Sequence, residues 1–251
     1  MKYGLCDLSI APLRNEASDR SELETQLLYG DLFKVLKSLK KWSYIRLERD
    51  DYEGWIDNKQ FVELEESDFK KLRETPKALA DDVLDYITLK DGEVQLVLMG
   101  SNVGVCPFLN HSFQGKVRKD ITPSYSGIIT TANLYRNTPY LWGGKTHFGI
   151  DCSGFTQMVY AMNGINIPRN ARDQANIGEA LSFIEEAEAG DLAFFDNEEG
   201  LITHVGIILE DNFIIHAHGK VRIDRLDQTG IFNSEINNHT HKLRVIRKIL
   251  V

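Results

Sequence analysis

A cysteine at the start of an amphipathic segment constrains the fold of this chain more than any other feature. It lies within residues 139–157, PYLWGGKTHFGIDCSGFTQ, where a glycine-rich aromatic loop runs directly into an apolar repeat. Apolar residues then recur at the i, i+4 and i+7 positions of a helix, namely Phe155, Val159 and Met162. The polar residues expected to face away from them are Thr156, Gln157 and Asn163. This period predicts a helix whose first turn contains Cys152.

The position of Cys152 favours chemistry at its sulfur. The first turn of a helix has unpaired N–H groups and the positive end of the helix dipole. Both stabilise a thiolate, and we expect the pKa of Cys152 to fall below the free value of about 8.5. The thiolate is the nucleophilic form of cysteine. The alternative is a small buried apolar residue, which describes most free cysteines, so a nearby base has to decide between the two.

Candidate bases lie on a predicted hairpin of residues 203–209 and 213–219. A three-residue loop at 210–212 brings apolar pairs together on one face, namely Leu209–Phe213, Ile207–Ile215 and Val205–Ala217. The other face then carries His204, His216 and His218, with Gly206 opposite His216. A two-residue loop at 211–212 would instead place His204 and His216 on opposite faces. The apolar pairing favours the three-residue loop.

Two imidazoles on one face of a sheet fit a general base and a partner that orients it. His204 is the expected base, while the hairpin geometry leaves open whether His216 or His218 is its partner. A lone strand histidine would more simply be a hydrogen-bonded structural residue. Two of them, together with the cysteine that begins a helix, favour catalysis.

The composition of the 251 residues excludes several classes of function. The formal net charge of −8 gives no basic surface for nucleic acid and no polybasic patch for membranes. No run of eighteen apolar residues predicts a membrane span. Cysteines at 6, 106 and 152 have no metal-ligand spacing, so Cys6 and Cys106 are expected to be buried and inert. Without a secretory signal we expect a cytoplasmic protein, and removal of a leader would instead imply a periplasmic or secreted one.

Four segments are expected along the chain. Residues 1–64 contain about five short strands separated by turns, which predicts a small all-β barrel. Residues 65–79 are charged and predict a linker with room for a helical turn. Residues 80–120 predict a second, degenerate small β-domain. Residues 121–251 place helices before an antiparallel hairpin, which predicts an α+β domain.

Five ordered motifs in the last segment resemble one family. PYLWGG, DCSGF, GDLAFF, HVGII and FIIHA look like the NlpC family of papain-like cell-wall cysteine peptidases, over roughly residues 124–251. The resemblance implies a papain-like domain in which a helix bearing the cysteine packs on an antiparallel sheet. It also implies Cys152 as nucleophile, His204 as base and His216 as the orienting residue. It implies no metal and no cofactor.

The N-terminal segments sharpen this resemblance. LETQLLYG, KKWSYIRL and YEGW resemble a bacterial SH3-like domain. Two such domains before the catalytic one resemble γ-D-glutamyl-L-diamino-acid endopeptidases of the dipeptidyl-peptidase type. Those enzymes act on murein peptides with a free N-terminal L-Ala and release L-Ala-γ-D-Glu. The likeness implies that Glu24 and Tyr52 bind the substrate ammonium, and that Tyr140, Asp151 and Ser153 contact the substrate beside the thiol.

One departure from that pattern, and two rival functions, qualify the expected substrate. After Ile-Pro-Arg the relatives tend to have Asp-Ser, whereas this chain has Asn170-Ala171. Arg169 is expected either to bind the α-carboxylate of D-Glu or to form a surface salt bridge.

The rival functions are an amidase or acyltransferase on the same fold, and a non-catalytic wall-binding protein. The sequence does not choose between L-Lys and meso-diaminopimelate after D-Glu, and it gives no oligomeric state.

Overall fold

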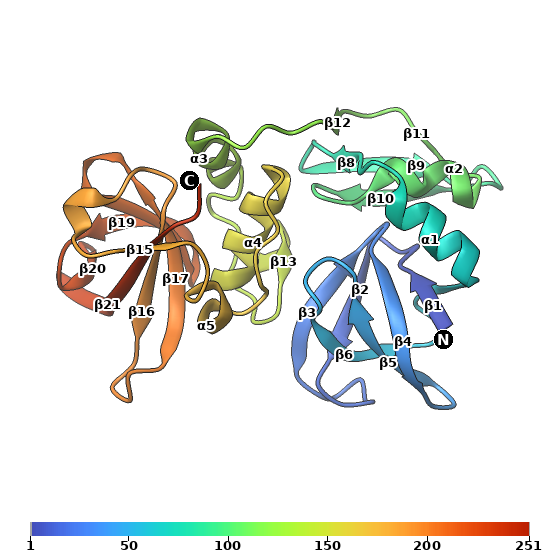
Figure 1. Ribbon diagram of the computed structural model, residues 1–251, viewed down its shortest axis with the longest axis horizontal. Coiled ribbons are helices and arrows are strands. Elements are labelled where there is room, and N and C mark those ends of the chain that lie inside the picture. Colours follow the sequence, from blue (N-terminus) through green and yellow to red (C-terminus); the bar gives the residue numbers. More distant parts are fainter. Residues whose placement is uncertain (1, 251) are drawn as a thin grey trace. The chain divides into compact units, whose positions relative to one another are not determined.

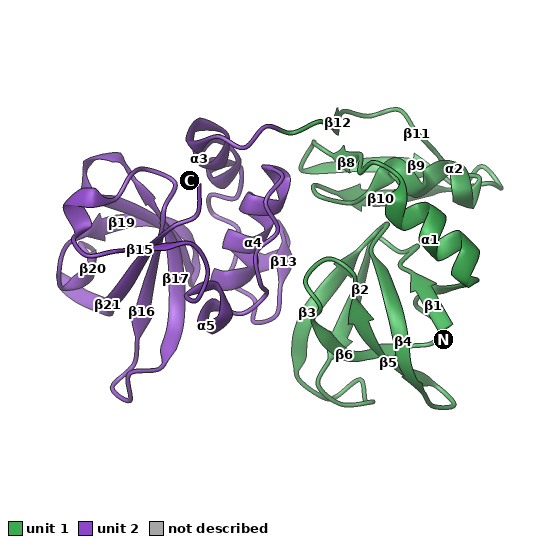
Figure 2. Ribbon diagram, in the orientation of Figure 1, with its two compact units in different colours: residues 1–121 green, residues 122–251 purple. Residues whose placement is uncertain are grey.

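The computed structural model describes residues 2–250 (Figure 1). Contacts divide the chain into two compact units, residues 1–121 and residues 122–251 (Figure 2). Within residues 2–250 the structure has no helix that is both long enough and apolar enough to cross a membrane.

The first unit begins with a seven-stranded antiparallel sheet in the order β3-β2-β6-β5-β4-β1-β7. Its strands are β1 Lys2–Leu5, β2 Ile10–Arg14, β3 Leu23–Leu28, β4 Leu32–Ser38, β5 Trp42–Leu47, β6 Glu53–Asp57 and β7 Val62–Leu64. Alternate residues along these strands point inward and bury an apolar core that includes Leu13, Phe33, Ile45 and the thiol of Cys6. The predicted small barrel is confirmed.

A second core joins the rest of unit 1 to the barrel. Helix α1 (Glu66–Glu74) lies in the expected linker, and its Phe69 stacks on Tyr3 of β1 with ring centroids 4.2 Å apart. The same core contains Ile87 and Val97 from the next strands. The remaining elements are β8 Leu79–Ala80, β9 Leu84–Thr88, β10 Val94–Leu98, the 3-10 turn Val103–Val105, α2 Cys106–Leu109, β11 Ser112–Phe113 and β12 Val117–Arg118. The division into residues 1–64, 65–79 and 80–120 stays a prediction.

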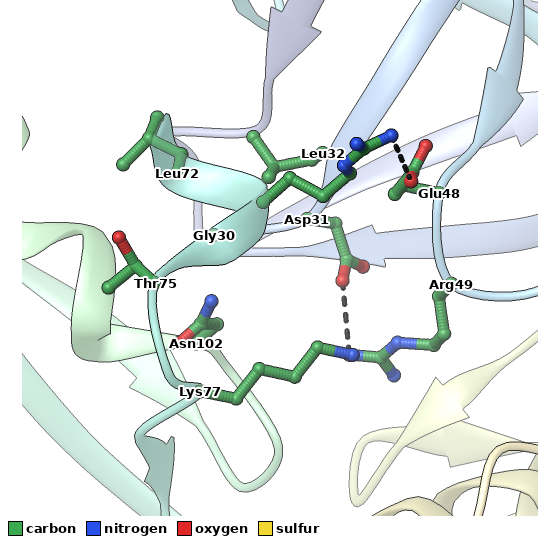
Figure 3. A pocket seen from close by; sticks show the side chains of 10 residues that line it. Gly30, Asp31, Leu32, Glu48, Arg49, Leu72, Thr75, Lys77 and Asn102 are labelled. Carbon is green, nitrogen blue, oxygen red and sulfur yellow. Dashed lines mark hydrogen bonds and ion pairs between the residues drawn. The ribbon is translucent and has the colours of Figure 1, made fainter. Parts of the chain in front are cut away.

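Unit 1 also contains a small cavity of about 60 Å³ (Figure 3). Among its lining residues, Arg49 and Asp31 form an ion pair of 3.0 Å, and Lys77 and Arg73 carry further positive charge. Its lining residues include neither a cysteine nor a histidine. This cavity therefore offers no thiol or imidazole for nucleophilic chemistry, and the candidate site has to be sought in unit 2.

Unit 2 places helices against a seven-stranded sheet in the order β15-β21-β16-β17-β18-β19-β20, and β20 also pairs with β21 to close it. The helices are α3 Tyr125–Leu134, α4 Cys152–Met162 and α5 Ala171–Gln174. The strands of the sheet are β15 Glu179–Leu181, β16 Leu192–Asp196, β17 Ile202–Leu209, β18 Phe213–His218, β19 Lys220–Leu226, β20 Gly230–Asn233 and β21 Asn238–Lys248. A short hairpin, β13 Lys145–Thr146 and β14 Gly149–Ile150, and the 3-10 turn Ile184–Glu186 complete the unit. Helix α4 packs on β17 and β18 (Figure 1), so the α+β prediction is confirmed.

The hairpin of β17 and β18 has the predicted register. Leu209 pairs with Phe213, Ile207 with Ile215 and Gly206 with His216, around the three-residue loop Glu210–Asn212. Asp211 and Asn212 both have positive φ, a conformation that aspartate and asparagine tolerate better than most residues. Because side chains alternate along a strand, this register places His204 and His216 on one face.

The prediction that one side of α4 faces away from the core is wrong. Thr156, Gln157 and Asn163 are all buried, because α3 and α5 cover that side of the helix. Each polar side chain has a partner there: Thr156 Oγ1 donates to Gln174 Oε1 (2.7 Å), and Asn163 Nδ2 donates to Thr131 Oγ1 (3.1 Å). Buried polar groups are tolerated when they are hydrogen-bonded in this way.

Candidate active site

Cys152 is the first residue of α4, as the sequence predicts, and Asp151 caps the helix. The Asp151 carboxylate accepts hydrogen bonds from the backbone N–H of Gly154 (2.7 Å) and of Gly143 (2.8 Å) in the preceding loop. The cap satisfies one of the N–H groups that an α-helix leaves unpaired. A side chain at Gly154 would place its Cβ 2.4 Å from the carbonyl oxygen of Gly144, so only glycine lets the loop lie against the helix here. Cys152 is thereby held in place from both sides.

Arg169 is committed to Asp151. Its guanidinium forms two bonds with the carboxylate, Nη1 to Oδ1 at 3.0 Å and Nη2 to Oδ2 at 2.5 Å, and Nη1 also donates to Ser153 Oγ at 2.8 Å. The Arg169 side chain is only 2% exposed, so the expected surface salt bridge is wrong. The bidentate pair ties the segment after α4 to the residues that flank the thiol. Substrate contacts by Asp151, Ser153 and Arg169 stay predictions.

Three side chains form a hydrogen-bonded row on the sheet. His204 Nε2 lies 2.8 Å from His216 Nδ1, and His216 Nε2 lies 3.0 Å from Asp224 Oδ2. His204 is 6% exposed and His216 is fully buried. The row selects His216, rather than His218, as the partner of His204. Opposite His216, a Cβ on Gly206 would come within 2.9 Å of the His216 Cβ, so this position is too crowded for a side chain.

Asp224 fixes the proton positions along this row. Arg222 binds its carboxylate through Nε (2.7 Å) and Nη2 (2.9 Å). Burial raises the pKa of Asp224, but hydrogen bonds from His216 and Arg222 outweigh burial and leave that pKa below its ordinary value. An ionised carboxylate only accepts, so His216 must donate from Nε2 and accept at Nδ1. His204 then donates from Nε2, which leaves the lone pair of its Nδ1 free to act as a base.

The thiol of Cys152 lies against the strand that carries His204. The backbone N–H of Val205, the residue after His204, hydrogen-bonds the sulfur. Burial raises the pKa of the Tyr140 hydroxyl, and the charges of Cys152 and Asp151 raise it further. Tyr140 therefore also lies close to the thiol. The backbone N–H of Tyr140 donates to the carbonyl of Gly219 at 3.0 Å, which anchors the loop beside the end of β18. The structure thus gathers Cys152, His204, His216 and Tyr140 at one place.

The expected low pKa of Cys152 is wrong for the resting protein. Burial, and secondly the Asp151 carboxylate, raise the pKa of the thiol to about 12, against smaller opposing effects from Val205, Arg169 and Ser153. A dipole at a helix terminus contributes less than full desolvation of a charge. Burial also drives the pKa of His204 well below its ordinary value, with further lowering by the neighbouring imidazoles. Both shifts favour the uncharged forms of these groups, a thiol at Cys152 and a neutral imidazole at His204.

Sequence reasoning missed two residues of this region, Asp224 and His241. Asp224 lies on β19, where charged residues alternate with Val221 and Ile223, and that alternation was the available signal for a third strand after the hairpin. His241 lies on β21 and stacks on His204 with ring centroids 4.1 Å apart. Strand β21, which carries His241, is distant from the β17–β18 hairpin in the sequence. No local pattern therefore predicts that His241 lies beside His204.

Models of two known protein families match parts of this chain. The NlpC/P60 family model matches residues 137–240, a span that contains Tyr140, Cys152, His204 and His216. The chain carries an NlpC/P60 peptidase domain. The model of the bacterial dipeptidyl-peptidase SH3 domain matches residues 13–61 in the barrel of unit 1. The predicted family, the SH3-like barrel and the assignment as a hydrolase are confirmed.

Two relatives align with most of this chain. A γ-D-glutamyl-L-lysine dipeptidyl-peptidase of Bacillus subtilis (strain 168) is 29% identical over 221 residues, which is 78% of this chain and 72% of the relative. A protein of the same name from Bacillus cereus is 27% identical over 80% of this chain and 68% of its own length. The crystal structure of an NlpC/P60 family protein from Bacillus cereus matches with a TM-score of 0.77 at 21% identity, over 99% of this chain and all of that one. That structure shares the fold.

Proposed function

We propose that this NlpC/P60 protein hydrolyses the γ-D-glutamyl–L-diamino acid bond of peptidoglycan peptides whose N-terminal L-Ala is free. The products would be L-Ala-γ-D-Glu and a peptide or amino acid that begins with the diamino acid. The observation that carries the proposal is the unbroken row from Asp224 through His216 to His204, beside a thiol at a helix N-terminus. The names of the two Bacillus relatives support the substrate class.

The row defines how the proton moves in the proposed reaction. His204 Nδ1 takes the proton of Cys152 as the sulfur attacks the γ-carbonyl carbon, so imidazolium and thiolate character appear together. In this proposal the backbone N–H of Cys152 and the Tyr140 hydroxyl stabilise the oxyanion. His204 then gives its proton to the leaving amine as the C–N bond breaks. In the second half, His204 takes a proton from water, water attacks the thioester, and the sulfur leaves and recovers the proton.

Asp224 acts through His216 in this proposal and touches no substrate atom. Its negative charge stabilises the proton on His216 Nε2, and so fixes the tautomer of both imidazoles. It also stabilises the positive charge that His204 acquires during attack. The row thus supplies both the orientation of the base and part of the charge balance that a buried thiol requires.

The proposed ammonium-binding pair lies in unit 1. The Tyr52 hydroxyl donates to Glu24 Oε2 at 2.6 Å, and both side chains are half-buried. A carboxylate held in place by a neighbouring hydroxyl presents its remaining lone pairs to a donor, and an ammonium is the donor that forms the strongest such bonds. The role of Glu24 and Tyr52 in selecting a free N-terminus is part of the proposal, as is the predicted cytoplasmic location.

Mass spectrometry of the products from paired peptides tests the proposal. The peptides L-Ala-γ-D-Glu-L-Lys and its N-acetylated form are each incubated with wild-type protein and with Cys152→Ala, with the meso-diaminopimelate peptides and a muramyl peptide in parallel. Release of L-Ala-γ-D-Glu only from the free peptides, and only by wild type, is expected. Equal cleavage of capped peptides would remove the dipeptidyl-peptidase specificity, and cleavage by Cys152→Ala would overturn the mechanism.

A further inference from the structure

Three histidines, one of which is the base His204, bring their ring nitrogens close together. One ring nitrogen from each of His204, His216 and His241 lies within 4.8 Å of the others. The rings come from β17, β18 and β21, and His218 lies at their edge, with its centroid 4.8 Å from that of His241. The hydrolysis described above needs only His204 and His216. The position of His241 against them is therefore unexplained by that reaction.

The group has the chemistry of a site for a divalent transition-metal ion. Neutral imidazole is a common ligand of zinc, with a metal–nitrogen distance of about 2.0–2.1 Å, so two nitrogens on one ion lie at most about 4 Å apart. Movement of one ring by roughly an ångström closes the widest gap to that limit. His241 is only partly buried, whereas His204 and His216 are buried, so His241 is the ring that we expect to shift. Its Nδ1 faces Thr240 Oγ1 at 2.8 Å, which leaves Nε2 for an ion.

His216 already has the outer partner that metal-binding histidines usually have. Its Nε2 donates to the Asp224 carboxylate at 3.0 Å, which orients the ring and makes Nδ1 a better electron-pair donor. An open hollow of about 650 Å³ is lined by His241, together with Glu198, Asp196 and Lys242. The His241 edge of the group is therefore accessible to an ion from solution.

We propose that His204 Nε2, His216 Nδ1 and His241 Nε2 bind one divalent transition-metal ion, such as Zn²⁺, and that this binding inhibits the peptidase. The fourth position is filled by His218 or a water molecule. The ion replaces the hydrogen bond between His204 and His216. The proton that His204 carried on Nε2 moves to its Nδ1, and the ring stays neutral. Nδ1 then has no lone pair to accept the proton of Cys152. The inhibition rests on the proposed function, whereas the binding of the ion does not.

Calorimetric titration with ZnCl₂ tests the binding in four proteins: wild type, Cys152→Ala, His241→Gln and His239→Gln. His239 is the matched control, because it lies two residues from His241 on β21 but pairs with Asp227 at 2.8 Å. We expect one Zn²⁺ per wild-type chain, equal affinity in Cys152→Ala and His239→Gln, and roughly 100-fold weaker affinity in His241→Gln. Loss of binding in Cys152→Ala would overturn the proposal in favour of a thiol-centred site, and full affinity in His241→Gln would also overturn it.

A spectroscopic measurement decides the matter if His241→Gln does not fold. Co²⁺ is added to wild type and to Cys152→Ala, and the visible and near-ultraviolet spectra are compared. Superimposable spectra without a thiolate charge-transfer band support the three-histidine site, whereas a thiolate band present only in wild type overturns it. Inhibition is read separately, as the Zn²⁺ concentration that halves each protein's own metal-free rate. Binding without inhibition would overturn only the regulatory half of the proposal.

Discussion

Cys6 in the barrel of unit 1 and Cys152 in unit 2 are both buried thiols, and burial raises the pKa of each. Cys6 lies in an apolar core that includes Leu13 and Phe33, and its thiol donates a 3.5 Å hydrogen bond to the carbonyl of Leu8. Cys152 instead lies at a helix N-terminus, against the strand that carries His204. The comparison teaches that burial alone disfavours the reactive thiolate of both cysteines. In the proposed mechanism, a nearby base that becomes charged as the sulfur attacks distinguishes Cys152 from Cys6.

The largest expected effect comes from removing one sulfur or the other. Cys152→Ala is expected to lower kcat by about a million-fold, the loss seen when a nucleophile is deleted from a coupled catalytic set. Cys6→Ala should leave kcat unchanged and lower the free energy of unfolding by about 1 kcal/mol, since it removes one buried atom from a packed core. Product formation and thermal unfolding of both variants provide the check. Comparable losses of kcat in both would contradict the distinction between the two thiols.

Local sequence patterns predicted two parts of this site, the helix position of Cys152 and the register of the histidine hairpin. The apolar repeat after Gly154 placed Cys152 in the first turn of a helix, and the apolar pairs around Ile207 set the hairpin register. The sequence did not predict the pKa of Cys152, because that pKa depends on how completely distant segments exclude water from the thiol. The buried polar side of α4 had the same cause: Gln157 is covered by a segment whose carbonyl at Ile167 accepts its side-chain N–H at 3.0 Å.

The second prediction removes the charge at the end of the histidine row. Asp224→Asn is expected to lower kcat by about 10²–10⁴-fold with little change in KM, because His216 and His204 lose the tautomers that leave Nδ1 free. Asp224→Glu should recover part of the rate. The matched control is Asp227→Asn, which breaks a 2.8 Å aspartate–histidine pair with His239 and should not alter kcat.

Steady-state kinetics on the free peptide, with a melting curve for each variant, separate positioning from simple destabilisation. Full activity of Asp224→Asn would show that the row is not part of the reaction. A loss that Asp224→Glu does not recover, and that follows the melting temperature, would assign Asp224 a purely structural role.

The third prediction concerns the ion pair that flanks Cys152. Arg169→Ala leaves the buried Asp151 carboxylate without its main partner, and is expected to lower the free energy of unfolding of unit 2 by roughly 3–5 kcal/mol. The unpaired negative charge should also raise the pKa of Cys152 further and slow its alkylation by iodoacetamide. Lys248→Gln, which breaks an exposed 2.9 Å pair with Glu188, is the control and should leave unfolding nearly unchanged. Faster alkylation in Arg169→Ala would contradict the proposed electrostatics.

The smallest expected effect tests whether the barrel contributes to binding as well as to folding. Tyr52→Phe removes the hydroxyl that orients Glu24, and a lost hydrogen bond of about 0.5–1.5 kcal/mol predicts a KM roughly 2–10-fold higher for the free peptide. Because an ammonium bound equally in the ground and transition states affects binding alone, kcat should not change. Tyr44→Phe is the matched control, since Tyr44 hydrogen-bonds a different glutamate, Glu53, in the same barrel. If both variants raise KM equally, or if kcat falls instead, the barrel acts through its stability and the ammonium-binding role of Glu24 and Tyr52 is removed.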